Sequence, residues 1–533
     1  MKQTLFLVFA VLALFIFGCQ QKEKSPYSNS VIAAAHPLAS QAGKSMYANG
    51  GNAFDAAIAA AFTLAVVEPS MSGIGGRLQA IYRTEKGTIA GVDASTEVPS
   101  AYVPSETKYR YGYPTIGIPG VVAGLLKLHE THAQLPLTTL LAPAIKHAEE
   151  GFEVLAGEAK RQQAAVSQLQ EFEGSRYHFL KEDSTAYQAG ERLVQKELAV
   201  VLRKIAQQGK AGFYEGEVAQ KMVTDIQSQG GILTLADLKQ YEARSSRILL
   251  GRFQNHTLHS LYLPSFGALT LQILQIMDHL PKVKTEEEWA KQVGEVTEWA
   301  YSFRHKQKIE DSLQKIISYD AAALWAKMLQ DKKTEMAALP WTSDPLAWTA
   351  PMGHTTHLTA ADQWGNSVAL TQTVGPNMGS KVATKGLGFI YAVTLGGYLG
   401  KFQPGDRASS FISPTMVTRD GNLIAALGAA GGSRIVTAVT QVLSRYLAQG
   451  HDLEKALMLP RVYPFQDSLW IENHKGLEGV RAQFDPQQQP VKYIDEYARF
   501  GRVHAIGKHP QKAAWIGAAD PDWEGTTEYY ENE

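Results

Sequence analysis

One segment of the sequence has to be enclosed by the rest of the protein. Residues Asp55 to Val67 read DAAIAAAFTLAVV, which is apolar around nearly the whole circumference of a helix. A helix without a polar face is buried on most of its sides. Its small side chains favour close packing against a sheet, and Pro69 marks its end. The chain therefore has to supply neighbours that surround this helix.

Other segments predict those neighbours. A short apolar run at Val31–Ala35 predicts a strand, and Ser40–Asn49 predicts a helix that Gly50-Gly51 terminates. Residues 120–330 are rich in Leu, Ala, Glu and Lys, which predicts a mostly helical region. The polar, proline-bearing stretch over 325–350 predicts an exposed connector.

A second set of patterns follows that connector. An amphipathic helix is predicted over Val436–Ala448. Alternation predicts strands at Thr356–Ala361, Ser367–Thr373, Gly388–Val393, Thr415–Thr418 and Leu423–Gly428. Helices early and late in the chain with strands between them favour a layered arrangement of helices and sheets.

The N-terminus carries a targeting signal. Lys2 precedes an unbroken apolar run from Leu5 to Phe17, which is too short to span a membrane comfortably and is typical of a signal peptide. Gly18-Cys19 then resembles a bacterial lipobox, in which the cysteine is acylated and becomes the mature N-terminus. We expect a lipoprotein signal peptide over residues 1–18, a lipid on Cys19 and a polar tether over residues 19–30. The alternative is an ordinary signal peptide followed by an incidental cysteine.

Composition narrows the choice of partners. Cys19 is the only cysteine of the 533 residues, so an intrachain disulfide is impossible. The formal net charge of −1 gives no global field that would attract nucleic acid or an anionic surface. We expect a protein of the bacterial cell envelope, periplasmic or at the outer membrane, that meets the membrane through its lipid anchor only and binds no nucleic acid.

A hairpin signal surrounds Thr355. Asp362-Gln363-Trp364-Gly365-Asn366 joins two alternating runs and carries a glycine in the loop. If the hairpin is centred on Trp364, Thr355 lies opposite Thr373. Opposed side chains lie about 4.5–5.5 Å apart at Cβ, so the hydroxyl of Thr373 is predicted to reach Thr355 and hold it in position.

A glycine-rich turn follows a later strand. Gly431 and Gly432 come after the run Leu423–Leu427. Adjacent glycines let backbone N–H groups turn towards a ligand without a Cβ in the way, and two such donors can hold the oxyanion of an acyl-transfer transition state. By itself a Gly-Gly pair is more often a plain turn.

Several stretches, in order and across nearly all of the chain after the tether, resemble γ-glutamyltranspeptidase sequences. The two most specific are residues 33–76 and HTTHLTAADQWGNSVALTQT over residues 354–373. The others are GIPGVVAG (117–124), PAIKHAEEGF (143–152), SPTMV (413–417), GAAGGSRIV (428–436) and GAADPD (517–522).

This resemblance implies a fold and a reaction. The fold is α+β: the Ntn-hydrolase αββα sandwich, with two stacked antiparallel sheets between helical layers. The family's precursors cleave themselves, and the bond here would be His354–Thr355. Residues 31–354 would then form a large subunit and residues 355–533 a small catalytic subunit of one joint domain.

The resemblance also assigns the catalytic groups. Thr355 would be the nucleophile, and its newly freed α-amino group, with a reference pKa of about 7.7–8, would act as the base. Thr373 matches the family's hydroxyl partner, and Gly431 and Gly432 match its oxyanion glycines. Ser409 and Ser410 match the family's substrate-binding Ser-Ser pair only after a one-residue shift, because a gapless match falls on Ser410 and Phe411. No metal or other cofactor is expected.

The residues that grip the substrate's head group depart from the family. Ser95 stands where an Arg binds the α-carboxylate, and Gly397 stands where an Asp binds the α-amino group. Gly375 replaces an amide residue. Losing a bidentate Arg contact is a large change, so we expect weak binding of glutathione and better relative activity on acyl amides without the zwitterion. Arg77 interrupts the family's glycine run; it is either a substitute for the lost Arg or an exposed surface residue.

Two functions remain on this evidence. The first is an active amidohydrolase or acyltransferase that cleaves γ-glutamyl amides such as glutathione, or a related acyl amide, with water or an amine as acceptor. The second is a catalytically lapsed, lipid-anchored binding protein on the same fold. Retention of Thr355, Thr373, Gly431 and Gly432 favours the first. His129 and His132 are one residue short of the zinc-protease spacing, and we expect them to be solvated helix residues.

Overall fold

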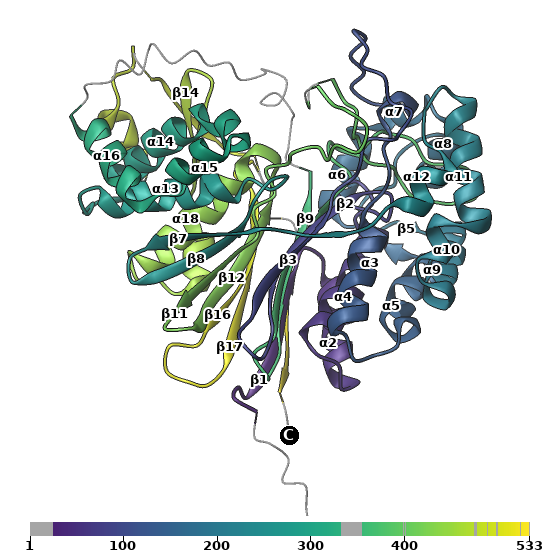
Figure 1. Ribbon diagram of the computed structural model, residues 1–533, viewed down its shortest axis with the longest axis horizontal. Coiled ribbons are helices and arrows are strands. Elements are labelled where there is room, and N and C mark those ends of the chain that lie inside the picture. The colour runs from purple at the N-terminus through teal and green to yellow at the C-terminus, as the bar shows by residue number, and fades with distance from the viewer. Residues whose placement is uncertain are drawn as a thin grey trace, which may run out of the picture.

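Two antiparallel β-sheets lie face to face, and helices cover the outer face of each sheet (Figure 1). The computed structural model describes residues 25–331 and 354–531, apart from residues 398, 400, 474–476, 488, 497–498 and 523. The predicted αββα sandwich of the α+β class is therefore confirmed.

The first sheet has seven strands, in the order β18-β1-β9-β10-β2-β3-β6. They are β18 (Thr526–Glu531), β1 (Asn29–Ala34), β9 (Thr356–Ala361), β10 (Ser367–Thr373), β2 (Arg77–Arg83), β3 (Ile89–Ala94) and β6 (Arg244–Ser245). The sheet thus joins strands from both sides of the predicted cleavage point, because β1, β2 and β3 precede His354 while β9, β10 and β18 follow it.

The second sheet has six strands, in the order β17-β16-β12-β11-β8-β7. They are β17 (Trp515–Ala519), β16 (Arg502–Lys508), β12 (Asn422–Ala430), β11 (Thr415–Arg419), β8 (His256–Leu261) and β7 (Ile248–Phe253). Smaller sheets are formed by β13 (Val462–Phe465), β14 (Ser468–Glu472) and β15 (Val491–Ile494), and by β4 (Phe152–Glu153) with β5 (Arg192–Leu193).

Separate helical layers cover the two sheets (Figure 1). The layer on the first sheet contains α2 (Pro37–Ala48), α3 (Ala53–Val67), α4 (Val121–His132), α5 (Leu137–Glu150), α6 (Ala156–Gln163), α7 (Val166–Leu169), α8 (Glu173–Phe179), α9 (Lys196–Gln208), α10 (Ala211–Tyr214), α11 (Gly216–Ser228) and α12 (Leu235–Gln240). The layer on the second sheet contains α13 (Gly267–His279), α14 (Glu286–Ser302), α15 (Glu310–Ile316), α16 (Tyr319–Gln330), α18 (Ile435–Leu447) and α19 (Leu453–Met458).

Helix α3 is enclosed as the sequence requires. All of its residues are buried, and it packs against α2, α5 and the two central strands β9 and β10. It begins at Ala53, two residues before the predicted start, because Asn52 caps it and the side chain of Asp55 bonds back to the Asn52 N–H. Asp362, in the turn after β9, also accepts a hydrogen bond from the Ala53 N–H, at 2.9 Å. The helix is thus tied directly to the central hairpin.

The two sheets meet through a thin apolar layer. Val31 and Ile81 of the first sheet pack with Met416, Ala426 and Ile506 of the second. Gly428 of β12 faces His357 of β9 across the space between the sheets. A Cβ at position 428 would lie 2.4 Å from the imidazole ring, so any larger residue would force that ring to shift.

The structure corrects one prediction and adds to another. Residues 388–393 do not form a regular strand, because their backbone is divided among bridges with three separate segments, at Ala383, Gly75 and Ile116. The region 120–330 is mostly helical, as predicted, but it also contributes the hairpin β7–β8 to the second sheet. The polar pair Gln254-Asn255 between the runs 248–253 and 256–261 was the available sequence signal for that hairpin.

The chain enters the sandwich at the end that lies away from Thr355. The Tyr27 N–H donates to the Gln363 carbonyl at 3.1 Å, and the Tyr27 ring stacks on Trp515 with centroids 4.0 Å apart. Residues 1–24 and 332–353, which hold the predicted signal peptide, Cys19 and most of the predicted connector, lie outside the described residues. Among the helices of the described ranges, none is long and apolar enough to cross a membrane.

Candidate active site

Thr355 lies immediately before β9, beside the end of β10. The two strands pair with Thr356 opposite Gln372 and His357 opposite Thr371, which is the predicted register. One step further along, the Thr355 hydroxyl donates to the Thr373 hydroxyl at 3.2 Å. The predicted approach of the two side chains is therefore confirmed.

Both hydroxyls also contact the carbonyl of His354. The Thr373 hydroxyl donates to the His354 oxygen at 3.0 Å, and the single proton of the Thr355 hydroxyl is shared between that oxygen and Thr373 Oγ1. The Gly375 N–H donates to Thr373 Oγ1 at 2.9 Å, which fixes the direction of that hydroxyl. All three of His354, Thr355 and Thr373 are buried. A nucleophile, a carbonyl and a donor to that carbonyl are thus gathered in one place.

This arrangement suits an attack of Thr355 on the preceding peptide bond. The attack would place negative charge on the His354 oxygen, and Thr373 already donates to that atom. Donors that are aligned before the reaction stabilise such charge without reorganisation. The hydroxyl–hydroxyl contact also provides a path by which the Thr355 proton can leave through Thr373.

The predicted oxyanion glycines lie at the same end of the sandwich. Gly431 and Gly432 follow β12, and the last residue of β12, Ala430, pairs with Arg502 of β16, which contacts the Thr355 carbonyl. Gly431 has φ 147° and Gly432 has φ 59°, so both adopt backbone conformations that favour glycine. A Cβ at Gly431 would lie 2.8 Å from Gly501 Cα.

Ser409 and Ser410 lie in the half-buried segment before β11. The Ser410 N–H donates to the Pro264 carbonyl at 2.7 Å. Phe411, which a gapless match places at the second serine of the family's pair, stacks on Phe266 with centroids 4.7 Å apart. Position 411 therefore contributes to an aromatic cluster instead of a hydroxyl.

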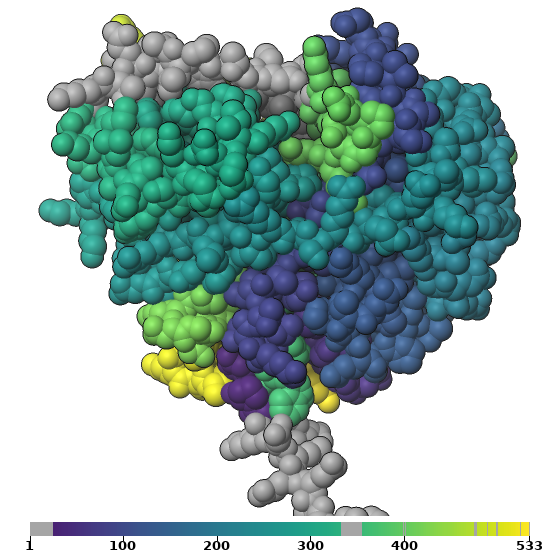
Figure 2. Space-filling view, viewed as in Figure 1, coloured from purple at the N-terminus to yellow at the C-terminus, as the bar shows by residue number. Residues whose placement is uncertain are grey.

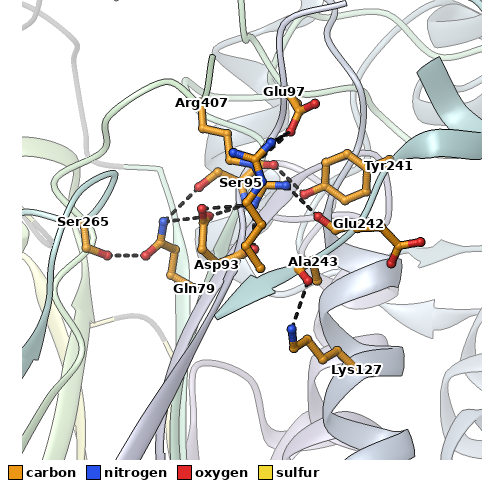
Figure 3. A network of polar contacts seen from close by, with 11 residues as sticks. Gln79, Asp93, Ser95, Glu97, Lys127, Tyr241, Glu242, Ala243, Ser265 and Arg407 are labelled. Atoms are coloured by element: carbon orange, nitrogen blue, oxygen red, sulfur yellow. Dashed lines mark hydrogen bonds and ion pairs between the residues drawn. The ribbon is translucent and has the colours of Figure 1, made fainter. Parts of the chain in front are cut away.

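Ser95 is sealed inside a polar network (Figure 3). It is buried, and the Gln79 amide donates to its hydroxyl at 2.8 Å. Its carbonyl accepts a hydrogen bond from the Tyr241 hydroxyl at 2.6 Å, and its N–H donates to Asp93 at 2.9 Å. Because Ser95 is enclosed in this network, its side chain does not extend into the active site.

Arg407 is the cation of this network, and the sequence analysis did not single it out. It pairs with Asp93 at 3.0 Å and with Glu97 at 3.1 Å, and it donates to the Glu242 carbonyl at 2.6 Å. Its guanidinium lies over the Tyr241 ring, 5.1 Å from the centroid. Because these contacts occupy most of its donors, Arg407 joins the two predicted subunits and does not replace the missing Arg as a substrate ligand.

Arg77 is buried, not a surface residue. Only 2% of it is exposed, and it pairs with Thr373 in the β2–β10 ladder. Its guanidinium donates to the Val393 carbonyl and lies 3.6 Å from where a Cβ on Gly375 would be. This places a positive charge on the strand next to the two hydroxyls, so the surface alternative is wrong.

A lysine packs against Gly397. A Cβ at position 397 would lie 2.5 Å from Lys108 Cβ, and the Gly397 N–H donates to the Tyr109 carbonyl at 3.0 Å. The resembling family has an Asp at this position. Here position 397 is too close to Lys108 for any residue larger than glycine. The carbon stem of the exposed Lys108 borders the place where that carboxylate would be.

His357, on β9 two residues after Thr355, is neutral near pH 7. Burial lowers the pKa of His357 to about 3, and its ring bonds Thr371 at 2.7 Å and Thr359 at 2.9 Å.

His129 and His132 are half-buried, and His132 stacks on Phe54, so they are not fully solvated. Across the described ranges, no three His, Cys, Asp or Glu residues are grouped to hold a metal ion.

The comparison with known families agrees with this geometry. A sequence model of the Gamma-glutamyltranspeptidase family matches residues 39–530. The chain belongs to the γ-glutamyltranspeptidase family. It is therefore a member of an enzyme family of the glutathione hydrolase type, built on the Ntn-hydrolase fold.

Individual relatives span almost the whole chain. A glutathione hydrolase proenzyme of Pseudomonas sp. (strain A14) is 28% identical and covers 97% of each chain. The capsule biosynthesis protein CapD proenzyme of Bacillus anthracis is 28% identical over 93% of this chain and 90% of its own. The crystal structure of a cephalosporin acylase from Bacillus halodurans superposes with a TM-score of 0.85, at 25% identity, over 95% of this chain and 97% of its own.

The surface is hollowed beside the segment that follows β10. Figure 2 shows a notch at the top of the molecule, bordered on one side by the green segment that follows β10. That segment contains Val393 and Gly397, which the contacts above place beside Arg77 and Lys108.

Proposed function

We propose that this protein is an autoprocessed amidohydrolase that cleaves acyl amides through an acyl-enzyme on Thr355. The observation that carries the proposal is the cluster of the Thr355 hydroxyl, the Thr373 hydroxyl and the His354 carbonyl. The same hydroxyl serves two successive reactions, first on its own chain and then on substrate.

In the first reaction, Thr355 Oγ1 attacks the His354 carbonyl carbon. The C–N bond breaks, the nitrogen takes up a proton, and an ester joins the two fragments. Water then hydrolyses the ester, which leaves a carboxylate on His354 and a free amine on Thr355. The large fragment ending at His354 and the small fragment beginning at Thr355 remain together as a heterodimer, since both fragments contribute strands to each of the two sheets.

In the second reaction, the free amine of Thr355 accepts the proton of its own hydroxyl as that oxygen attacks the substrate's amide carbonyl. The N–H groups of Gly431 and Gly432 are assigned to the developing oxyanion. The substrate's amine leaves, and water or a second amine accepts the acyl group from Thr355.

The substrate class follows from the charges around the hydroxyl pair. A γ-glutamyl group carries an ammonium and a carboxylate, and each needs a fixed partner when it leaves water. Position 397 offers no carboxylate for an ammonium and is filled by the stem of Lys108, whereas Arg77 places a guanidinium, a group that pairs with carboxylates, beside Gly375. We therefore infer a preference for acyl amides without the α-amino group. The similarity to a protein named cephalosporin acylase supports a substrate other than glutathione.

Processing is tested on purified protein by denaturing electrophoresis and mass spectrometry. Wild type should appear as two fragments that join at His354–Thr355, and Thr355→Ala should stay as one chain. An active wild type that is not cut would contradict the mechanism. An uncut and inactive wild type would instead support the lapsed binding protein.

Specificity is tested with a γ-glutamyl anilide and its des-amino analogue. Wild type should have the higher kcat/KM on the analogue, and Lys108→Met should reduce the difference. Lys239→Met, which removes an exposed lysine on α12, is the matched control and should leave the ratio unchanged. A strong wild-type preference for the γ-glutamyl compound would refute the assignment. Restoring an Asp at position 397 is not a usable test, because its Cβ would clash with Lys108.

We also propose that Cys19 anchors the enzyme to a membrane of the cell envelope with its site directed away from the lipid. The segment from Cys19 to Ser25 can reach at most about 20 Å when extended. Tyr27 is fixed beside Gln363, in the turn at the far end of β9 from Thr355. The length of β9, about 20 Å, separates that turn from the nucleophile. Substrate would then arrive from the aqueous side.

A further inference from the structure

A cluster of buried charges lies directly beneath the nucleophile. Glu68, at the C-terminal end of α3, accepts a hydrogen bond from the Thr356 hydroxyl at 2.6 Å. Arg502 of β16 lies 3.7 Å from the Glu68 carboxylate, and Arg161 of α6 lies 3.6 Å from it. All of these side chains are at most 3% exposed. The charges are therefore fixed in position and weakly screened.

Arg502 and Glu68 hold the backbone of Thr355 from two sides. An Arg502 Nη atom donates to the Thr355 carbonyl at 3.5 Å, while Glu68 holds the next residue through its hydroxyl. The peptide between Thr355 and Thr356 is thus oriented by one cation and one anion. Such an arrangement limits rotation of the residue that has to present both a hydroxyl and an amine to the substrate.

The positive charge of Arg502 also affects the protonation of the amine that cleavage frees on Thr355. The amine that cleavage frees and the carbonyl that Arg502 contacts are attached to the same Cα of Thr355. A fixed positive charge this close disfavours a second positive charge on the amine. Only the neutral amine can accept a proton from the hydroxyl, so the cation favours the reactive form.

We propose that Arg502, held in place by Glu68, is a positioning residue that orients Thr355 and keeps its freed amine in the neutral, basic form. This proposal rests on the proposed function. It adds a cation from the second sheet, 147 residues away in the sequence, to a site whose nucleophile comes from the first sheet.

The other charged side chains around Thr355 include both cations and anions. Arg161 pairs with Glu158 at 3.0 Å, and Arg461 pairs with Asp520 at 2.6 Å. The further titratable or charged groups on neighbouring elements are Arg77 of β2, His357 of β9, Arg434 of η4 (Gly432–Arg434), His504 of β16 and Asp522. Burial keeps the pKa of both histidines low, so neither adds charge near neutral pH. Arg502 is the cation that directly contacts Thr355.

The test is the pH dependence of kcat/KM on an acyl anilide, measured on protein that electrophoresis shows to be cut. The acid limb of this profile reports the base of the free enzyme. Arg502→Gln should raise the pKa of the amine and move the limb up by about one pH unit. Glu68→Gln should move the limb down, and Arg502→Lys should stay close to wild type. Opposite shifts from two contacting residues are not expected from a general loss of stability.

Arg445→Gln is the matched control. Arg445 is a buried arginine of α18 that pairs with Glu286 at 2.7 Å, away from Thr355, and its replacement should leave the limb unchanged. If Arg502→Gln does not fold or process, the test rests on Glu68→Gln. An acid limb of the kcat/KM profile that is the same in Glu68→Gln as in wild type then overturns the proposal. The proposal is also overturned if the acid limb lies at the same pH in all variants. It is likewise overturned if Arg502→Lys shifts the limb upward as far as Arg502→Gln does. An uncut, inactive wild type would instead reject the proposed function.

Discussion

Replacing Thr373 with valine tests the assigned chemistry most directly. Valine has nearly the same shape as threonine, so it removes one oxygen and leaves little empty space. That oxygen donates to the His354 carbonyl at 3.0 Å and receives donors from Thr355 at 3.2 Å and from the Gly375 N–H at 2.9 Å. The substitution thus removes the group that polarises the scissile carbonyl and the acceptor for the Thr355 proton.

The expected magnitude follows from these contacts. Loss of one donor to a developing oxyanion typically slows a reaction about 10²–10³-fold, which corresponds to roughly 3–4 kcal/mol of barrier. The Gly375 N–H also loses its acceptor, which should cost about 1–3 kcal/mol of folding stability. We therefore expect Thr373→Val to fold and to process at least about 100-fold more slowly than wild type.

The assay follows the appearance of the two fragments on denaturing gels after synthesis. Thr371→Val is the matched control, because Thr371 lies two residues away on the same face of β10 and bonds His357 at 2.7 Å. It should lose similar stability and process normally. Thr373→Ser keeps the hydroxyl and should restore most of the rate. Normal processing of Thr373→Val, or equal slowing of Thr371→Val, would refute the reasoning.

Three further predictions concern stability and location. Burial lowers the pKa of His357 to about 3, so the unfolded chain binds a proton that the folded protein excludes, and the free energy of unfolding should fall as pH drops from about 6.5 to 3. His357→Gln should lessen that fall by about 3 kcal/mol at pH 4 in denaturant titrations. Gly428→Ala should cost about 1–3 kcal/mol because its Cβ would lie 2.4 Å from the His357 ring, and an unchanged unfolding midpoint would contradict this packing. Cys19→Ser should move the protein from the membrane fraction to the soluble fraction, whereas a wild type that is already soluble and free of lipid would rule out the anchor.

The sequence determined the parts of this protein that depend on local pattern. Alternation on either side of the turn at Trp364 set the register of β9 and β10, so the contact between Thr355 and Thr373 followed from counting residues. The unbroken apolar helix α3 required enclosure on several sides, and the sandwich provides it. These features are predictable because strand pairing across a short turn and burial of a whole helix involve neighbours in the sequence or a single periodicity.

Only the tertiary structure decided which charges surround the nucleophile. Arg77 is buried beside Gly375, and Arg407 is paired with Asp93 and Glu97. Arg502 reaches Thr355 from the other sheet. None of these arginines belongs to a local pattern that reveals its partner, since each contact joins segments that are far apart in the sequence. Whether such a cation is exposed, paired or directed at the site depends on how the two sheets stack, and no periodicity in the chain records that.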